Sequence, residues 1–278
     1  NDAGCIIIAI STKTPPLYYQ FRLKNFEGTT FIKIKYLYWW DDGDMFITDL
    51  GQLEKAIFLK RLNKFLGLVN LKGNLIKVHI HDSGKLDYLL YKGNEVMIKR
   101  VVKPHRKTMY DVVTARWHDS YILIHSRYHE KIARKIIESG KLPIDLQGEV
   151  KSEVFYENCR IDFLVKRCDK KNVWIEVKGC TLIENEIALF PDTPTKRGLK
   201  HLRKLIKIVK QGDIGVLLIL IFSKAECFFP NTRVDPDFSN TLWEALKEGV
   251  KIFPVTLYVK GIHIYFEKLI PLCNKLTQ

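Results

Sequence analysis

The sequence predicts a protein of the mixed α/β (α+β) class, in which a small β-barrel or sandwich precedes a mixed α/β domain. Short strand-like runs recur between Leu53 and Ser126, and turn residues such as Gly73 and Pro104 separate them. After Ser126 the apolar spacing changes to that of a helix, three strands, a helix and a strand. We therefore divide the chain into an N-terminal segment (1–44), a barrel domain (45–126) and a mixed domain (127–278).

The N-terminal half consists of β-prone pieces. Residues 1–44 are interrupted by Pro15-Pro16, Gly28 and an acidic turn at residues 41–44, and they contain no recognisable chemistry. Six strand-like runs follow, at residues 55–62, 64–71, 74–81, 94–102, 109–117 and 121–126. Their spacing is typical of a small antiparallel barrel or sandwich.

The C-terminal half combines helices and strands. Ile132, Ile136 and Ile137 have helical spacing, and Gly140 is the predicted stop. Three strands, EVKSEVFYE, CRIDFLVKR and NVWIEVKGC, precede a helix over about 194–211, with Thr193 as its predicted N-cap. The apolar run GVLLILIF predicts a strand buried on both faces. A helix over 240–248 and the strands VKIFPVTLYV and IHIYFEK close the chain.

Composition and charge narrow the classes of function. The 278 residues include 45 Lys and Arg against 31 Asp and Glu, which gives a formal charge of +14. A hydrophobic fraction of 46% describes a globular chain and excludes disordered and collagen-like classes. The basic excess favours a polyanionic partner, most often nucleic acid. The same net charge is compatible with an anionic membrane surface as partner, or with no partner.

Cysteine usage and apolar runs predict a cytoplasmic protein. The six cysteines form no CxxC pair, so we expect them to be reduced. The longest apolar runs, at residues 5–10 and 215–222, are far shorter than the roughly 20 residues of a membrane helix. The N-terminus lacks the layout of a signal peptide, so we expect no secretion and no membrane partner.

The strongest candidate site is carried by Asp162, Glu176 and Lys178. Side chains alternate along a strand, so Glu176 and Lys178 share one face. If the hairpin pairs with Arg167 opposite Lys171, Asp162 lies directly across from Glu176 on that face. Paired carboxylates suit Mg²⁺ or Mn²⁺, and the lysine suits a phosphoryl transition state. The alternative is a solvated hairpin with a surface ion pair.

The helix predicted over 194–210 carries one sign of charge. Seven Lys and Arg residues and no acid lie between Pro194 and Lys210, opposite a stripe that includes Leu202 and Leu205. The N-terminal amides add an anion site. We expect this face to contact phosphate backbones, the alternative being a solvated helix surface.

The barrel domain offers further basic and aromatic residues. Positive charge gathers at residues 60–64 and 99–107. Phe58, Phe65 and Tyr110 are candidate base-stacking platforms, although single aromatics are more often core residues. His79 and His81 alternate on one strand beside Asp82; we favour two exposed histidines over a metal site there.

Several motifs in fixed order resemble the sugar fermentation stimulation protein A (SfsA) family. They are RLNKF, HIHDSGKLDYLLYKG, RKTMYD, KSEVFYENCRIDFLVKR, WIEVKGCTL, ALFPDTPTKRGLKHLRKL and FFPNTRVDPDF, between about Leu53 and Pro271. Two residues depart from the family's pattern. Lys196 replaces a glutamate of the helix motif, and Glu130 stands where asparagine is usual. Residues 1–44 have no counterpart and Met45 lies near where the family begins, so we expect an upstream extension.

The resemblance implies an OB-fold-like barrel followed by a PD-(D/E)XK nuclease-like domain. It places Asp162, Glu176 and Lys178 at the core catalytic positions, with Glu153 in support, and Thr195, Gly198 and His201 in the family's helix motif. We expect the nucleic acid to be bound by basic residues of both domains. These are Arg61, Lys64, Arg106, Lys107, Lys196, Arg197, Lys200, His201 and Lys204.

We therefore expect a cytoplasmic nuclease that needs Mg²⁺ or Mn²⁺, held by Asp162 and Glu176, and that acts on DNA, with RNA as a second substrate. The alternative is a non-catalytic DNA-binding transcriptional regulator of sugar-metabolism genes that retains the nuclease fold. An anionic-lipid binder ranks last, because no amphipathic insertion helix is present. Oligomeric state and sequence specificity stay open.

Overall fold

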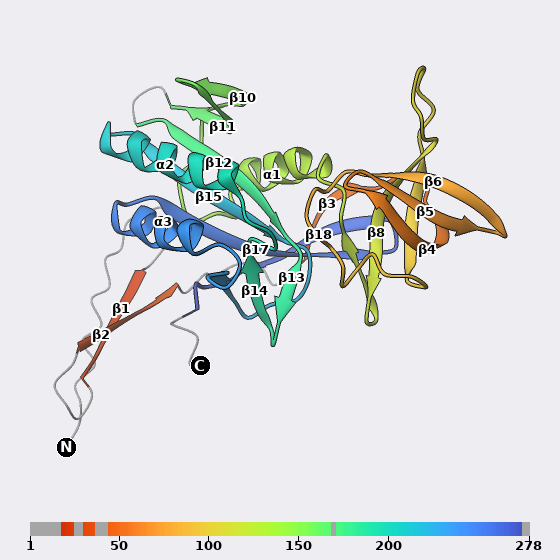
Figure 1. Ribbon diagram of the computed structural model, residues 1–278. Coiled ribbons are helices and arrows are strands. Elements are labelled where there is room, and N and C mark those ends of the chain that lie inside the picture. Colours follow the sequence, from red (N-terminus) through yellow and green to blue (C-terminus); the bar gives the residue numbers. More distant parts are fainter. Residues whose placement is uncertain (1–17, 25–29, 37–43, 168–170, 274–278) are drawn as a thin grey trace. The chain divides into compact units, whose positions relative to one another are not determined.

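The computed structural model describes residues 18–24, 30–36, 44–167 and 171–273, and it divides into two compact units. The first, residues 1–43, contains strands β1 (Tyr18–Lys24) and β2 (Thr30–Tyr36), which pair antiparallel with each other. The second, residues 44–278, contains the barrel and the mixed domain (Figure 1). No helix within the described ranges is long and apolar enough to cross a membrane.

A closed barrel forms the first part of the second unit. Its five strands are β4 (Glu54–Asn63), β5 (Leu66–Leu71), β6 (Asn74–Ile80), β7 (Glu95–Arg100) and β8 (Tyr110–Trp117). Parallel pairing of β6 with β8 closes a sheet that is otherwise antiparallel, and β9 (Ser120–Leu123) extends it. Alternating residues such as Phe58, Val69 and Val78 fill the interior. All six predicted strand runs are confirmed.

The mixed domain is built on a seven-stranded sheet in the order β10-β11-β12-β15-β17-β18-β3. Its strands are β10 (Glu149–Tyr156), β11 (Cys159–Lys166), β12 (Val173–Cys180), β15 (Ile214–Ile221), β17 (Lys251–Lys260), β18 (His263–Leu269) and β3 (Met45–Asp49). The central β12, β15 and β17 run parallel, and the outer pairs are antiparallel. The predicted mixed α/β class with an N-terminal OB-type barrel is confirmed.

Three helices cover the two faces of this sheet. They are α1 (Tyr128–Glu138), α2 (Lys196–Lys210) and α3 (Pro236–Lys247). On β15, Val216, Leu218 and Leu220 belong to the core that contains α1, whereas Leu217 and Ile219 belong to the core that contains α2 and α3 (Figure 1). The apolar central strand is therefore buried on both faces, as its sequence predicts.

Two helix starts differ from the sequence prediction. The N-cap of α2 is Thr195 rather than Thr193, since the Thr195 hydroxyl accepts a 3.0 Å hydrogen bond from the Gly198 amide. Helix α3 begins at Pro236, four residues before the predicted start, because the Asp235 carboxylate caps it through the Phe238 amide at 2.9 Å. In both cases a side-chain acceptor fixes the first turn.

The predicted domain boundary at residue 45 is wrong for one strand. β3 (Met45–Asp49) pairs with β18 and so belongs to the sheet of the mixed domain rather than to the barrel. One hydrophobic cluster runs from barrel residues such as Phe58 to sheet residues such as Val216. The barrel and the mixed domain therefore share a core.

A small three-stranded sheet escaped the sequence prediction. It contains β13 (Leu182–Glu184), β14 (Ile187–Phe190) and β16 (Cys227–Pro230), which are three or four residues long. Backbone hydrogen bonds join β16 to the C-terminal segment, including Cys273 N–H to Phe228 O at 2.9 Å. This contact allows a Cys227–Cys273 disulfide, so the expectation of reduced cysteines is wrong for this pair. Cys159 and Cys180 are free and buried.

Candidate nuclease site and nucleic-acid surface

The predicted acid pair lies on neighbouring strands in the predicted register. Phe163 pairs with Ile175 and Leu164 with Trp174 across β11 and β12, which brings Asp162 level with Glu176. Backbone pairing stops at this point, and the Asp162 carboxylate takes over by accepting a 2.7 Å hydrogen bond from the Val177 amide through Oδ2. The carboxylate thus replaces the next hydrogen bond of the ladder and is fixed in direction.

Glu176 occupies the centre of the site. Its side chain is 1% exposed, and its Oε1 accepts hydrogen bonds from the Lys178 ammonium and from Nδ1 of His201. Lys178 therefore lies on the same face as Glu176, as the strand alternation predicts. The second oxygen, Oε2, is buried and has no hydrogen-bond partner among the residues that the structure describes. A buried carboxylate oxygen without a partner is costly unless a cation or water satisfies it.

His201 is brought to this site by α2. The Arg197 Nε–H donates to His201 Nε2 at 3.4 Å, which leaves the imidazole proton on Nδ1 for the bond to Glu176. The sequence prediction placed His201 among phosphate-contacting residues, and this is wrong, because the residue is 4% exposed. Its helical spacing from Gly198 and Leu205, both buried, was the signal that places it on the inner face.

The two carboxylates have pKa values shifted in opposite directions. Burial, and then the charge of Glu176, raises the pKa of Asp162 to about 6. Burial also acts to raise the pKa of Glu176, but the Lys178 ammonium and the His201 hydrogen bond outweigh it, and the pKa lies below its usual value. Near neutral pH the pair therefore holds negative charge that burial disfavours, which a cation would stabilise.

The donor set fits a hard divalent cation. Both acids offer carboxylate oxygen, and the orphaned Oε2 of Glu176 is a free ligand atom inside the site. Lys178 and His201 hydrogen-bond to the other oxygen of Glu176, so they orient the carboxylate and leave Oε2 available to a cation. Asp162 and Glu176 are the residues that would hold Mg²⁺ or Mn²⁺ here.

Glu153 lies apart from this network. It stands on β10 at a break in the pairing with β11, with a φ of +55°, and it forms a 2.7 Å ion pair with Arg160. The side chain is about half exposed. The structure therefore directs the Glu153 carboxylate to Arg160.

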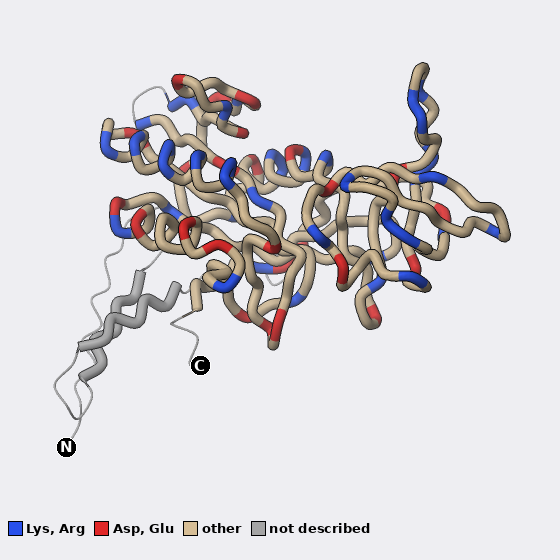
Figure 2. Tube along the Cα trace, in the orientation of Figure 1, with Lys and Arg blue, Asp and Glu red and all other residues tan. Residues whose placement is uncertain are grey.

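Helix α2 presents the predicted basic face (Figure 2). Lys196, Arg197 and Lys200 are exposed in its first turns, next to the His201 that enters the site. Lys200 donates to the Asn158 carbonyl at 3.0 Å. Further along, Lys204 and Lys207 are both paired with Glu157, so the charge at that end is partly neutralised. Among the described residues Lys196, Arg197, Lys200 and Arg203 form no ion pair, so the unpaired charge of this face lies in the first half of α2, whose N-terminal end is beside the acid pair.

The two predicted barrel arginines make internal contacts. Arg61 donates to the carbonyls of Lys64, Asp82, Gly84 and Lys85, at 2.6–3.0 Å. Arg106 binds the Asp111 carboxylate. Both guanidinium groups therefore position loops instead of standing free for phosphate.

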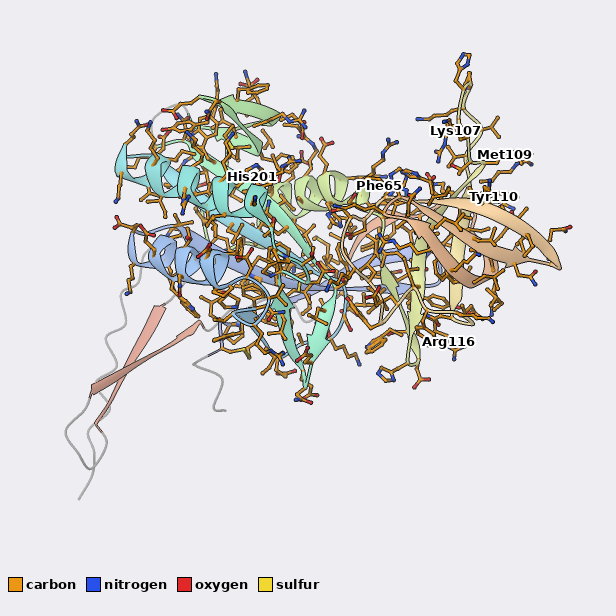
Figure 3. All side chains as sticks on the ribbon, viewed as in Figure 1. Phe65, Lys107, Met109, Tyr110, Arg116 and His201 are labelled. Atoms are coloured by element: carbon orange, nitrogen blue, oxygen red, sulfur yellow. A yellow bond between two sulfur atoms is a disulfide. The ribbon has the colours of Figure 1, made fainter. Side chains whose placement is uncertain are left out.

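Lys64 and Lys107 remain exposed on the barrel. Of the three aromatic candidates, Phe58 is fully buried and Tyr110 packs on the core. Phe65 alone among them is largely exposed, at 48%, with the Lys64 ammonium 6.0 Å from its ring centre (Figure 3). Of the three candidates, Phe65 is thus the one whose ring is accessible, and Lys64 lies beside it.

A pocket of about 160 Å³ lies between the barrel and the mixed domain. Its lining includes Asp82 and Gly84 from the barrel, and Gly179, Thr181, Asp192 and Thr195 from the mixed domain. Gly179 follows the catalytic candidate Lys178, and Thr195 caps α2. A more open hollow beside it is lined by Lys64, Gly84 and Lys85. Ser83 and Gly84 line both hollows, so the two hollows are neighbours, and Asp162, Glu176 and Lys178 line neither of them.

Comparison with known proteins supplies independent findings. The family model described as the SfsA N-terminal OB domain matches residues 59–124, and the sugar fermentation stimulation protein RE domain matches residues 127–261. A sugar fermentation stimulation protein homolog of Thermosipho melanesiensis is 43% identical over 228 residues, covering 82% of this chain and 98% of the relative. The homolog of Saccharolobus solfataricus is 41% identical, covering 80% of this chain and 87% of the relative.

A solved structure, that of Pyrococcus furiosus SfsA in complex with Ca²⁺, has a similar fold. It aligns with a TM-score of 0.77 at 29% sequence identity, covering 83% of this chain and all of that chain.

Proposed function

Because the chain belongs to the sugar fermentation stimulation protein (SfsA) family, we propose that it is a nucleic-acid-binding protein and a divalent-metal-dependent nuclease. The observation that carries the proposal is the contact of Glu176 with Lys178 and His201 beside Asp162, under the basic first turns of α2. The substrate is DNA, with RNA as a second substrate. The reaction is hydrolysis of a phosphodiester, in which water attacks phosphorus and one ester oxygen leaves with a proton.

The chain's own residues bind and orient the reactants. Glu176 holds the Lys178 ammonium in a fixed direction, and His201 holds Glu176 through Nδ1. Lys178 presents a positive charge where negative charge develops on the phosphoryl oxygens. Asp162 and Glu176 would hold Mg²⁺ or Mn²⁺, which when bound would supply further positive charge to the phosphate. The Pyrococcus furiosus SfsA structure is a complex with Ca²⁺, an ion that prefers oxygen ligands as Mg²⁺ does, and this supports the proposal of a divalent cation here.

The surrounding surface supports a nucleic-acid partner. Lys196 and Arg197 offer exposed charge at the N-terminus of α2, where the helix dipole also attracts phosphate. The barrel matches the family's OB domain, and it adds Lys64 and the exposed Phe65, on which a base can stack. Gly179, the neighbour of Lys178 in the sequence, lines the hollow that lies between the barrel and the N-terminus of α2.

Cleavage assays with defined substrates test the proposal. Single- and double-stranded oligonucleotides of DNA and of RNA are incubated with the purified chain in Mg²⁺, Mn²⁺ or EDTA. We expect cleavage with either metal and none in EDTA, and we expect Glu176→Ala and Lys178→Ala to lower the rate by at least about 100-fold. The variants Glu244→Ala and Lys260→Ala change exposed residues that lie outside the site, and as matched controls they are expected to retain the activity.

Two outcomes would contradict the nuclease proposal. Metal-dependent cleavage that survives in both Glu176→Ala and Lys178→Ala places the activity at another site or in a contaminant. Salt-sensitive binding of DNA without cleavage in any metal assigns the chain to the non-catalytic regulators, with log affinity falling by about 0.9 per phosphate contact as log salt rises.

A further inference from the structure

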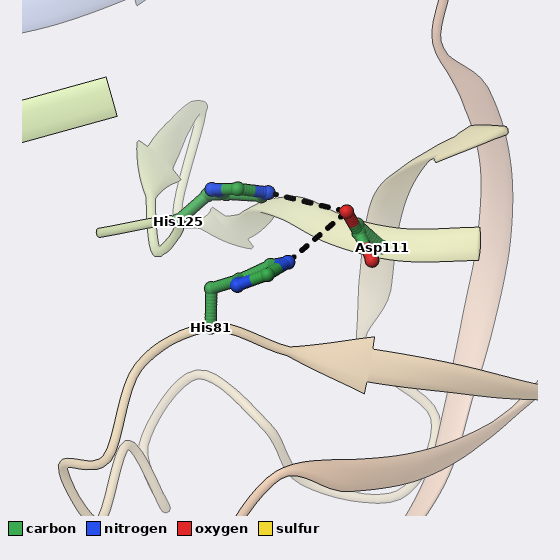
Figure 4. A group of neighbouring side chains, drawn as sticks. All are labelled: His81, Asp111 and His125. Carbon is green, nitrogen blue, oxygen red and sulfur yellow. Dashed lines mark ion pairs between the residues drawn. The ribbon is translucent and has the colours of Figure 1, made fainter. Parts of the chain in front are cut away.

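A second group of possible ligands lies in the barrel and shares no residue with the acid pair. His81 directly follows β6, Asp111 lies near the start of β8, and His125 follows β9 (Figure 4). The parallel pairing that closes the barrel sets Ile80 opposite Val112, and this brings His81 next to Asp111. The sequence prediction had considered His79, His81 and Asp82 together. Barrel closure instead selects His81 alone and joins it to two residues more distant in sequence.

The three side chains converge on one point. His81 Nε2 lies 3.0 Å and His125 Nε2 3.5 Å from the same Asp111 oxygen, Oδ2. The two imidazole rings are 4.0 Å apart and tilted by 30°, so their Nε2 atoms face the carboxylate from one side (Figure 4). In a tetrahedral zinc site with bonds of 2.0–2.2 Å, neighbouring ligand atoms are about 3.4 Å apart. The two measured separations bracket that value without any movement of the backbone.

Burial makes the unsatisfied atoms in this cluster costly. The side chains of His81 and His125 are each 7% exposed and that of Asp111 is 6% exposed. Within the described part of the chain, His81 Nε2 has no hydrogen-bond partner of acceptable geometry, and neither has Nδ1 of His125. A buried nitrogen that is aimed at a carboxylate but not hydrogen-bonded to it is what a metal ligand looks like without its metal.

The outer contacts hold the carboxylate in place. The Arg106 guanidinium binds Asp111 through Oδ1 and also approaches Oδ2 at 3.3 Å, and it donates to the Thr108 hydroxyl at the same distance. Hydrogen bonds to a ligating carboxylate are a usual feature of metal sites. The positive charge of Arg106 would repel a metal cation, and the negative charge of Asp111 offsets that repulsion. The choice of metal therefore depends on the two imidazoles.

We propose that His81, Asp111 and His125 form a second metal site, for Zn²⁺ or a related first-row transition-metal ion. Two imidazoles and one carboxylate favour such ions over Mg²⁺ or Ca²⁺, which prefer all-oxygen sites. Three protein ligands leave a fourth position for water or a substrate atom. The ion links the end of β6, the start of β8 and the segment after β9, so it stabilises the closed barrel.

Metal titration of the full chain tests this site. The purified protein is stripped with EDTA, dialysed, and titrated with Co²⁺ and with Zn²⁺ in excess Mg²⁺, with visible absorption, calorimetry and elemental analysis as readouts. We expect one equivalent of Co²⁺ or Zn²⁺ to bind, and Zn²⁺ but not Mg²⁺ to raise the melting temperature through this site. X-ray absorption at the bound zinc is expected to show nitrogen and oxygen neighbours, two of them imidazoles, without sulfur.

Variants separate this site from other histidines and from the acid pair. His81→Gln and His125→Gln are expected to weaken binding by more than about 100-fold, because losing a ligand costs more than losing an outer partner. His118→Asn, an exposed turn residue outside the cluster, and Asp162→Asn, in the acid pair, are expected to keep the affinity. Far-UV circular dichroism establishes that each variant is folded.

The proposal is overturned if the stripped wild-type chain binds no Zn²⁺, or if folded His81→Gln binds it unchanged. Binding lost in Asp162→Asn but kept in His81→Gln assigns the ion to the acid pair. A sulfur neighbour in the absorption spectrum assigns it to cysteine. The wild-type titration and spectrum decide the question even if both glutamine variants fail to fold.

Discussion

The variant Asp162→Asn measures how much the ionised Asp162 carboxylate lowers the free energy of unfolding. The amide keeps an oxygen to accept the Val177 N–H, which the wild-type carboxylate accepts at 2.7 Å, and it removes the charge that lies beside Glu176. In the wild-type chain burial raises the pKa of Asp162 to about 6, from an ordinary value of 3.8. Between pH 4 and 6 the native state therefore binds more protons than the unfolded state, and the free energy of unfolding falls as pH rises through this window.

The size of the effect follows from the pKa difference of about 2 units. Each unit corresponds to about 1.4 kcal/mol, so ionised Asp162 costs the native state about 3 kcal/mol at pH 7 and only about 0.5 kcal/mol at pH 4. In EDTA, Asp162→Asn is thus expected to gain stability relative to the wild type as pH rises, by about 2 kcal/mol from pH 4 to pH 7. Titrating groups that do not interact with Asp162 cancel in this comparison because both chains carry them, whereas Glu176, Lys178 and His201 are coupled to Asp162.

Guanidinium unfolding at pH 4, 5, 6 and 7 in EDTA measures the difference directly, provided that the transition is cooperative. Mg²⁺ reverses the order if the acid pair holds it, because the ion stabilises the wild type and not the variant. A variant whose stability relative to the wild type is the same at every pH would refute the raised pKa. A variant that gains equally from Mg²⁺ would refute Asp162 as a ligand.

Three further changes test other parts of the fold. Gly179→Ala places a Cβ 2.3 Å from the His129 ring, so we expect a loss of about 1–3 kcal/mol in the free energy of unfolding, measured by urea denaturation. Cys227→Ser opens a link to Cys273 across 46 residues and is expected to cost up to about 4 kcal/mol under oxidising conditions, with a smaller difference in dithiothreitol. Deleting residues 1–43 is expected to leave melting temperature and cleavage unchanged, since β1 and β2 pair only with each other among the described strands; an unfolded or inactive product contradicts this.

The sequence predicted the strands and helices well because their signals are local. The β11–β12 register follows from a short turn and an alternating pattern, and both lie within about 20 residues. The burial of β15 on both faces was likewise predicted from a local pattern, its uninterrupted apolar run. The small β13-β14-β16 sheet was missed because its strands are too short to show a period, and because residues far apart along the chain complete it.

The sequence by itself determined the class of fold, the shared face of Glu176 and Lys178, and the one-signed charge of α2, because strand alternation and helical spacing fix them. It placed Asp162 across from Glu176 on one assumed hairpin register, which the structure confirms. Only the tertiary structure decided that His201 turns inward to Glu176 and that Arg61 holds a loop. It alone joined His81 to Asp111 and His125. The physical reason is that these contacts depend on how a barrel closes and how a helix docks on a sheet, which local patterns do not encode.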